Sequence, residues 1–182
     1  MTSATSSTSY LPVARRLGAV VDAVPATVWS SPTPCEGWAA VDLLGHLIET
    51  QRDFLTGRGL DLGPAPDLST DPAAAWHRHA EAVGAALTPE VLATGFDGHF
   101  GPTTVGATLE QFYVWDMVVH RWDLATAAGL ADEFSADELD RIEGGADSFG
   151  DALYMEGVCK RREVPADADR PTRLLARLGR AA

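Results

Sequence analysis

Three side chains, His46, Asp116 and His120, have the types and the spacing of a metal site. Asp116 and His120 stand four residues apart within Ala107–Ala128, a stretch whose apolar residues recur with the helical period. Four residues are about 400° of helical rotation, so the two side chains project about 40° apart and one turn along. His46 is the other mid-helix histidine predicted to face the core. Two imidazoles and one carboxylate would bind a divalent ion and leave positions open for water or substrate, as catalytic zinc sites do.

The same spacing has a simpler interpretation. Aspartate and histidine four residues apart on a helix commonly form a local ion pair or hydrogen bond. Asp42 and His46 repeat the spacing, and we interpret Asp42 as a first-turn carboxylate favoured by the helix dipole. No glutamate precedes His46 or His120 by three residues and no His-Glu-x-x-His occurs, which excludes the di-iron bundle and common metalloprotease patterns. Spacing alone leaves a metal site and a structural pair as alternatives.

Two further carboxylates are candidates for catalytic roles beside this site. Glu49 follows His46 by three residues and is either a general base or a solvated side chain on the helix surface. Asp123 follows His120 by three residues. It could orient the imidazole of a metal ligand, or it could bond the backbone or Arg121.

The other histidines and the cysteines have weaker signals. His77, His79 and His99 are expected to be exposed polar residues. Cys35 stands in a proline-flanked loop and is interpreted as structural, because no histidine is found at a paired position. The segment Cys159–Glu163 contains the one cationic cluster of the chain and is either a solvated turn or a contact for a carboxylate or phosphate.

The helical period also predicts the elements that position these residues. The expected helices span Leu11–Val24, Ala39–Thr56, Pro72–Leu87, Ala107–Ala128, Ser135–Tyr154 and Asp169–Leu178. Residues 88–105 are expected to be irregular, apart from a short turn, and we expect no strand pairing. The pattern predicts an all-α four-helix bundle with a short C-terminal extension. A single domain over residues 11–182 would follow a disordered tail over residues 1–10.

Composition excludes several classes of partner. The 182 residues contain 14 Lys and Arg against 26 Asp and Glu, a net charge of −12, and 46% hydrophobic residues, which suffice for a core. The negative charge argues against nucleic-acid binding and against docking on anionic membranes. Two cysteines make no disulfide framework. Without a signal-peptide pattern or an apolar run of about 18 residues, we expect a cytoplasmic protein that acts on a small molecule, with a homodimer as one possible assembly.

Three ordered blocks resemble the DinB-like family that includes the mycothiol-dependent maleylpyruvate isomerases. The first comprises Pro32–Trp38 and Asp42–Ile48, and the second is Asp116–Ala125 followed by Ala128-Gly129. The third, Val164–Ala168 with Arg173–Arg180, is similar to the C-terminal signature of an actinobacterial metal-binding subgroup. The resemblance runs from about Val13 to Arg180. One departure is that Ala39 follows Trp38, where the family often has a hydroxyl-bearing helix cap.

The resemblance implies a DinB-like four-helix bundle with one divalent metal. A histidine on the second helix and a carboxylate-x-x-x-His pair on the fourth would be its ligands, which correspond to His46, Asp116 and His120. Some members use the metal to activate a low-molecular-weight thiol, mycothiol in actinobacteria. We therefore expect a metal-dependent thiol transferase or isomerase, with zinc as the ion or nickel, manganese or iron in its place. The alternatives are a non-catalytic metal- or small-ligand-binding bundle and a bundle without metal.

Overall fold

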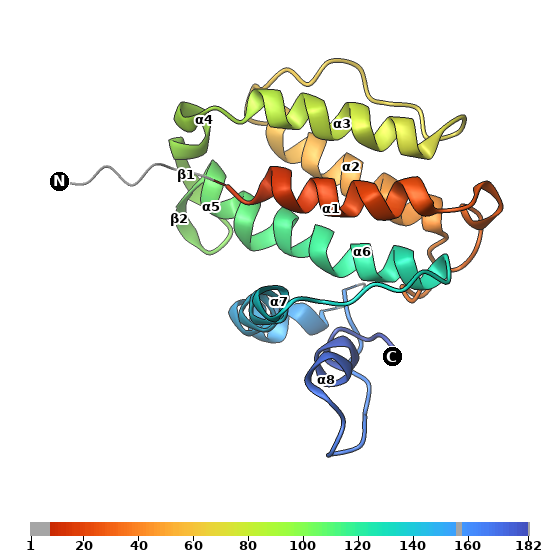
Figure 1. Ribbon diagram of the computed structural model, residues 1–182. Coiled ribbons are helices and arrows are strands. Elements are labelled where there is room, and N and C mark those ends of the chain that lie inside the picture. The colour runs from red at the N-terminus through yellow and green to blue at the C-terminus, as the bar shows by residue number, and fades with distance from the viewer. Residues whose placement is uncertain (1–7, 156–157, 182) are drawn as a thin grey trace.

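Four helices form the body of the protein. The computed structural model describes residues 8–155 and 158–181. The bundle helices are α1 (Tyr10–Ala23), α2 (Ala40–Thr56), α3 (Pro72–Ala86) and α6 (Trp115–Ala127). Helix α1 packs against α3 and α6, and α2 packs against the same two helices (Figure 1). The predicted all-α bundle is confirmed.

Shorter elements cover the two ends of the bundle and one side. Helix α4 (Pro89–Ala93), strands β1 (Gly95–Gly98) and β2 (Gly101–Thr104) and helix α5 (Val105–Thr108) lie together at one end (Figure 1). The π-helix η2 (Leu109–Val114) leads from α5 into α6, and a 3₁₀ turn, η1 (Ala26–Val28), follows α1. Helix α7 (Ala136–Phe149) packs on α6, continues into the 3₁₀ turn η3 (Gly150–Tyr154), and is covered by α8 (Arg170–Arg177).

Local capping interactions explain where the helices begin. The Asp71 carboxylate accepts a hydrogen bond from the backbone N–H of Ala74, and Pro72 occupies the first turn. Ser135 and Glu138 form the predicted capping box at the start of α7. Ala39 has no side-chain acceptor, and the Asp42 carboxylate accepts from its backbone N–H at 3.0 Å instead. Asp42 therefore stabilises the first turn of α2, as predicted.

Residues 95–104 are paired strands, so the expectation of an irregular segment without strands was wrong. The antiparallel register pairs Gly95 with Thr104 and Gly98 with Gly101, which leaves a two-residue turn at His99 and Phe100. A Cβ atom at Gly98 would lie 2.8 Å from Thr103 Cγ2, so a larger residue there would displace the Thr103 side chain. The hairpin is too short and too rich in glycine to show alternating hydrophobicity, which is the usual sequence signal for strands.

The predicted continuous helix over Ala107–Ala128 was also wrong in its first half. Residues 109–114 form a π-helix between α5 and α6. A π-helix widens the turn by one residue, and the apolar period that predicts helices does not distinguish it from an α-helix. Gly129 ends α6 with a φ of +66°, which fulfils the predicted role after the last turn.

The ordered domain begins before Leu11. The Glu110 carboxylate accepts hydrogen bonds from the Thr8 hydroxyl at 2.6 Å and from the backbone N–H of Ser9 at 2.5 Å, and Tyr10 is fully buried. Residues 8–10 therefore belong to the domain, contrary to the predicted tail, because the Glu110 carboxylate offers them a partner far along the chain. Residues 1–7, where the rest of that tail was predicted, lie outside the described residues.

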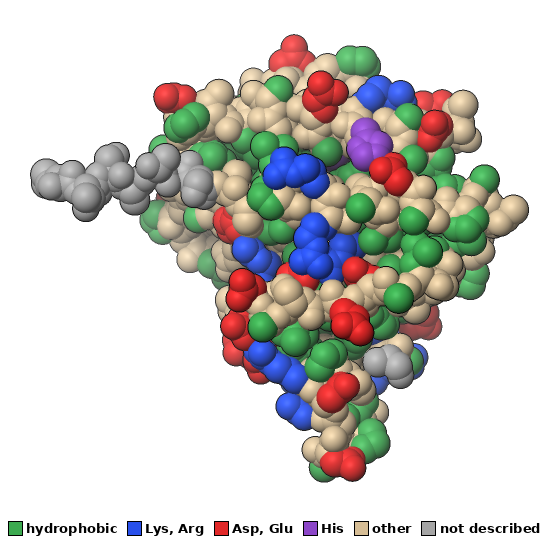
Figure 2. All heavy atoms as spheres, viewed as in Figure 1, with side chains coloured by type: hydrophobic (Ala, Val, Ile, Leu, Met, Phe, Trp, Pro, Cys, Tyr) green, Lys and Arg blue, Asp and Glu red, His purple; other side chains and the backbone are tan. Residues whose placement is uncertain are grey.

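Ion pairs join the bundle to α7. Arg16 on α1 contacts Glu138 at 2.8 Å, and Arg141 on α7 contacts Glu110 at 2.8 Å. Figure 2 shows Lys and Arg side chains gathered with acidic ones on the face where α1 approaches α7. None of the helices in the described part of the chain has the length and apolar character needed to cross a membrane.

A buried cluster of three hydrogen-bonded polar side chains lies between α1, α2 and α3. The Tyr10 hydroxyl donates to Gln51 Oε1 at 2.7 Å, and His79 Nε2 lies 2.9 Å from the same oxygen. His79 is 1% exposed, so its predicted exposure was wrong. Helix α3 directs the His79 side chain toward Gln51 of α2. The sequence near His79 does not reveal this hydrogen-bonding partner. Burial, with a smaller contribution from the charge of Arg52, lowers the pKa of His79 to about 4.

His79 should make the protein less stable in acid. Below its ordinary pKa of 6.5 the unfolded chain binds a proton that folded His79 does not bind until about 4. Folding stability is therefore lost as the pH falls through this window, by about 3 kcal/mol from this group. Urea unfolding of wild type and His79→Gln at pH 7.5, 5.5 and 4.0 measures the effect. The variant should lose less stability across the window, and equal losses in both proteins would contradict the assignment.

Candidate metal centre

Helices α2 and α6 bring the three predicted ligands together. His46 Nε2 lies 3.1 Å from Asp116 Oδ2, and His120 Nε2 lies 3.2 Å from Asp116 Oδ1. One donor atom from each residue lies within 4.8 Å of the others. Ligands at the corners of a tetrahedron with zinc–nitrogen distances near 2.05 Å stand about 3.3 Å apart. Donor atoms of the three residues therefore lie close enough together to share one divalent ion.

A carboxylate behind the centre fixes the orientation of the His120 ring through Nδ1, the ring nitrogen that does not contact Asp116. His120 Nδ1 lies 2.9 Å from Asp123 Oδ2. Asp123 in turn accepts two hydrogen bonds from Arg180, from Nη2 to Oδ2 at 2.8 Å and from Nε to Oδ1 at 3.1 Å. Asp123 is fully buried and Arg180 nearly so. The carboxylate thus holds His120 with Nε2 facing Asp116 and His46, which is the usual arrangement behind a metal-binding histidine.

The two carboxylates set the protonation of His120. Burial opposes charging of the imidazole, but the nearby charge of Asp116 and the hydrogen bonds to Asp116 and Asp123 outweigh it and raise the pKa of His120 well above 6.5. Burial likewise opposes ionisation of Asp116, while His120 and His46 lower its pKa below the usual range. A divalent ion held by these residues would take the place of the Nε2 proton and would leave the Nδ1 proton on the side of Asp123. The donor set therefore fits a metal as well as a proton.

One side of the centre is open. The side chains of His46 and Asp116 are 32% and 24% exposed, whereas that of His120 is 7% exposed. Trp38, in the loop before α2, packs against both imidazoles, with ring centroids 4.7 Å from His46 and 5.9 Å from His120. A small molecule can therefore approach from the side of His46 and Asp116, with the indole as a neighbouring wall.

Cys35 contacts the residues that lie behind the candidate metal centre. The sequence did not indicate this position. Its Sγ lies 3.3 Å from Asp123 Oδ2, 3.8 Å from His120 Nδ1 and 2.9 Å from Arg180 Nη2. Cys35, His120 and Asp123 also bring donor atoms within 4.8 Å of one another. However, the Arg180 guanidinium contacts both the thiol and the carboxylate, and its positive charge opposes a cation there. Cys35 thus lies against both Arg180 and Asp123, behind the candidate metal centre.

The segment Cys159–Glu163 contacts residues of its own chain. The Arg161 guanidinium donates to the Tyr154 hydroxyl at 3.0 Å and lies 5.1 Å from the centre of that ring. Lys160 is 3.8 Å from Glu36, and both side chains are largely exposed. Cys159 Sγ lies 3.9 Å from Arg180 Nη1, and burial raises the pKa of its thiol although Arg180 opposes this. These contacts favour the solvated-turn interpretation.

The two carboxylates predicted to have catalytic roles lie in different surroundings. Glu49 is exposed on α2, one turn after His46, and takes part in no hydrogen bond or ion pair within residues 8–155 and 158–181. Asp123 has both oxygens occupied by Arg180 and His120 in the interior. Glu49 can meet a ligand in solvent, whereas Asp123 acts on the centre only through His120.

Arg180 was not among the predicted site residues. It reaches Asp123 from the turn after α8, 57 residues along the chain, so no helical spacing connects the two. Its place in the block Arg173–Arg180 is the one sequence signal that includes it.

Most of the chain matches a known protein family. Residues 10–125 match the family described as the mycothiol maleylpyruvate isomerase N-terminal domain. Uncharacterized proteins from two strains of Mycobacterium tuberculosis are each 29% identical to the chain over 135 residues, which cover 63% of this chain and 52% of the relative. The chain thus spans about half the length of these relatives. No solved structure matches the chain.

The family match covers more than half of the chain. It includes the four bundle helices as far as residue 125 and all three residues of the candidate metal centre. Arg180 lies beyond it. The chain belongs to the mycothiol maleylpyruvate isomerase N-terminal domain family.

Proposed function

We propose that this protein is a divalent-metal-dependent enzyme that joins a low-molecular-weight thiol of the mycothiol type to a small molecule, or uses the thiol to isomerise it. The observation that carries the proposal is the convergence of His46, Asp116 and His120 at a point open to solvent on one side. Membership of a family described by a mycothiol-dependent isomerase supports the choice of thiol.

The charge of the centre supports an anionic ligand. Two neutral imidazoles, one carboxylate and a divalent ion sum to a charge of +1, which favours a thiolate over a neutral thiol. A divalent ion held there would lower the pKa of a bound thiol and stabilise the thiolate at neutral pH. Zinc fits two nitrogens and one oxygen, and nickel, manganese and iron accept the same donor set.

The residues around the centre have separate tasks in this proposal. Asp123 keeps the proton of His120 on Nδ1, so that the Nε2 lone pair faces the ion. Arg180 compensates the buried charge of Asp123. Trp38 shields one side of the imidazoles from water. Glu49 remains a candidate general base at the exposed rim of α2, and we assign Asp123 to orientation instead.

Metal content is the first test of this function. Protein purified without chelator should contain about one equivalent of zinc or another divalent ion by elemental analysis. His120→Ala should lose most of it, because a nitrogen ligand is removed. His77→Ala is the matched control, since His77 lies on α3 and pairs with Asp22. Wild-type protein that stays metal-free, also after incubation with zinc, would contradict the metal centre.

The Asp123–Arg180 pair should tune the metal affinity. Asp123→Asn weakens the acceptor behind His120, and the affinity for zinc should fall about 10–100-fold in a competition titration with a chromogenic chelator. Arg180→Met leaves Asp123 buried without its cation and should lower the free energy of unfolding by about 3 kcal/mol in metal-free protein. Arg170→Met removes an exposed arginine that pairs with Asp140 and Glu143, and should leave the zinc affinity unchanged. Equal zinc affinities in wild type and Asp123→Asn would oppose the orienting role.

Thiol chemistry is tested by turnover. Zinc-loaded protein should conjugate mycothiol to at least one member of a panel of electrophiles, as measured by loss of free thiol and by mass of the product. His120→Ala should abolish the activity and His77→Ala should retain it. Saturable binding of mycothiol without turnover across the panel would favour the alternative, a non-catalytic ligand-binding bundle.

A further inference from the structure

A small pocket lies between helix α3 and the loop that joins α2 to α3 (Figure 1). Its walls are Arg52 of α2, Arg78 and His79 of α3, and loop residues between 62 and 67. The candidate metal centre, by contrast, takes its residues from α2 and α6. The volume of the pocket is about 200 Å³, whereas pockets for small organic molecules usually have about 300–1,000 Å³. The pocket can therefore admit one small ion or a single functional group of a larger ligand.

Arg52 is held in place by the backbone of the loop. Its Nη1 donates to the carbonyl of Leu62 at 3.4 Å, and its Nη2 donates to the carbonyl of Gly63. Both acceptors are uncharged, and Arg52 forms no ion pair with a carboxylate within residues 8–155 and 158–181. Pro64 and Pro66, which also line the pocket, restrict the backbone of the loop because their φ angles are fixed. The guanidinium is thus positioned in advance, and its remaining N–H groups are available to an anion.

Arg78 supplies a second positive charge from α3. Its side chain is exposed and forms no hydrogen bond or ion pair within the described part of the chain. Asp67 lies on the same pocket, but its Oδ1 accepts from the backbone N–H of Ser69 at 2.8 Å and its Oδ2 lies 3.5 Å from the Thr70 hydroxyl. These hydrogen bonds, with a smaller contribution from the charge of Arg78, lower the pKa of Asp67. The three charged side chains on the pocket therefore sum to +1, in a chain whose net charge is −12.

The side of the pocket that faces the bundle is polar. His79 lies there, and burial together with the charge of Arg52 keeps the pKa of His79 at about 4, so its imidazole is neutral at pH 7. His79 Nδ1 and Gln51 Nε2 are buried and have no hydrogen-bonding partner among the described residues. The charge of Arg52 thus acts on a polar interior without a carboxylate to compensate it. This environment favours an anionic ligand over an apolar one.

We propose that this pocket binds a phosphate group between Arg52 and Arg78, either as inorganic phosphate or as the end of a small phosphate ester. A phosphate group has at least three oxygens that accept hydrogen bonds, so it can serve two guanidinium groups at once, whereas the two oxygens of a carboxylate are occupied by one. Its charge of about −1.5 to −2 at neutral pH compensates the positive charge of the pocket. The site is separate from the candidate metal centre and does not depend on the proposed function.

Binding is tested by titrating the ¹⁵N-labelled protein with inorganic phosphate at constant ionic strength and pH 7.5. Binding should be saturable, and the largest amide shifts should fall in residues 62–67 and 78–79. Arg78→Met should weaken binding at least about tenfold, the effect of one lost charge-assisted hydrogen bond. This variant is decisive because Arg78 makes no other polar contact within the described residues, whereas Arg52→Met would also release the loop. Arg15→Met, which removes an exposed arginine of α1, is the matched control and should bind phosphate as wild type does.

A parallel titration with glycerol 3-phosphate identifies the source of the phosphate group. Tighter binding of the ester assigns the pocket to phosphate esters, and tighter binding of inorganic phosphate assigns it to the free ion. His120→Ala should bind phosphate as wild type does, because its side chain lies in the candidate metal centre. Equal affinities of wild type and Arg78→Met would overturn the inference. Acetate that binds as tightly as phosphate, or amide shifts centred on His46 and Asp116, would overturn it as well.

Discussion

The buried carboxylate of Asp123 is the constraint on which the site depends. An ionised carboxylate removed from water is costly unless charged or hydrogen-bonding partners replace the solvent. Asp123 has such partners on two sides, His120 on its own helix and Arg180 from the end of the chain. Both of its oxygens are used. If either partner moved, the buried Asp123 carboxylate would lose part of the compensation for its charge. The orientation of His120 and the position of the C-terminal turn are therefore fixed together.

The C-terminal helices are attached to the bundle by charged contacts as well as by apolar packing. Glu138 closes the capping box of α7 and also binds the buried Arg121 of α6, which contacts Asp132 as well at 2.8 Å. The Glu138 carboxylate thus caps the first turn of α7 and also holds this helix against α6. Arg180 then joins the segment after α8 to Asp123. Such contacts specify one placement more strictly than apolar packing, because a shifted helix would leave buried charges unpaired.

Sequence reasoning succeeded where the relevant interaction is local. Asp116 and His120 are one helical turn apart, so their shared face follows from the period alone, and the caps at Asp71 and Ser135 are equally local. The three ligand candidates meet as predicted. Arg180 and Cys35 approach Asp123 from 57 and 88 residues away, and no periodicity encodes such distances. The hairpin was missed because its strands are short and contain several glycine and threonine residues. Backbone hydrogen bonds hold them together, and their sequence shows no alternation of apolar and polar residues.

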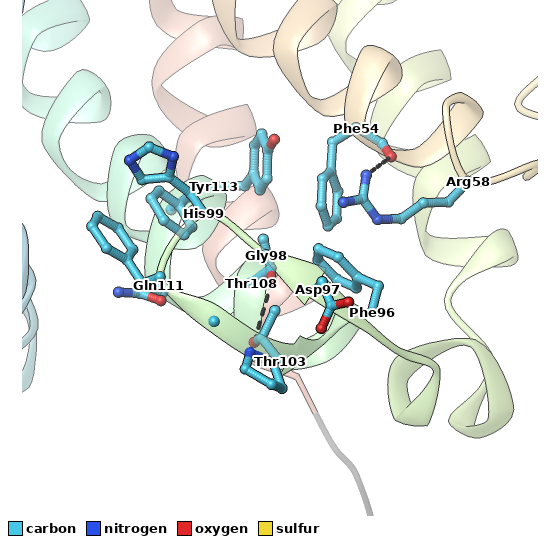
Figure 3. Close-up of a pocket in the computed structure, with 14 residues that line it drawn as sticks. Phe54, Arg58, Phe96, Asp97, Gly98, His99, Thr103, Thr108, Gln111 and Tyr113 are labelled. Atoms are coloured by element: carbon cyan, nitrogen blue, oxygen red, sulfur yellow. Dashed lines mark hydrogen bonds between the residues drawn. The ribbon is translucent and has the colours of Figure 1, made fainter.

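The change from π- to α-helix divides one stretch of chain into two parts with different surroundings. Gln111, Phe112 and Tyr113 of η2 line a pocket beside the β1–β2 hairpin (Figure 3). From Trp115 onward the regular α-helix provides the i, i+4 spacing that places Asp116 and His120 in contact on one face. The π-helix therefore ends before the ligand candidates begin, and the pair Asp116 and His120 keeps the geometry of a regular α-helix.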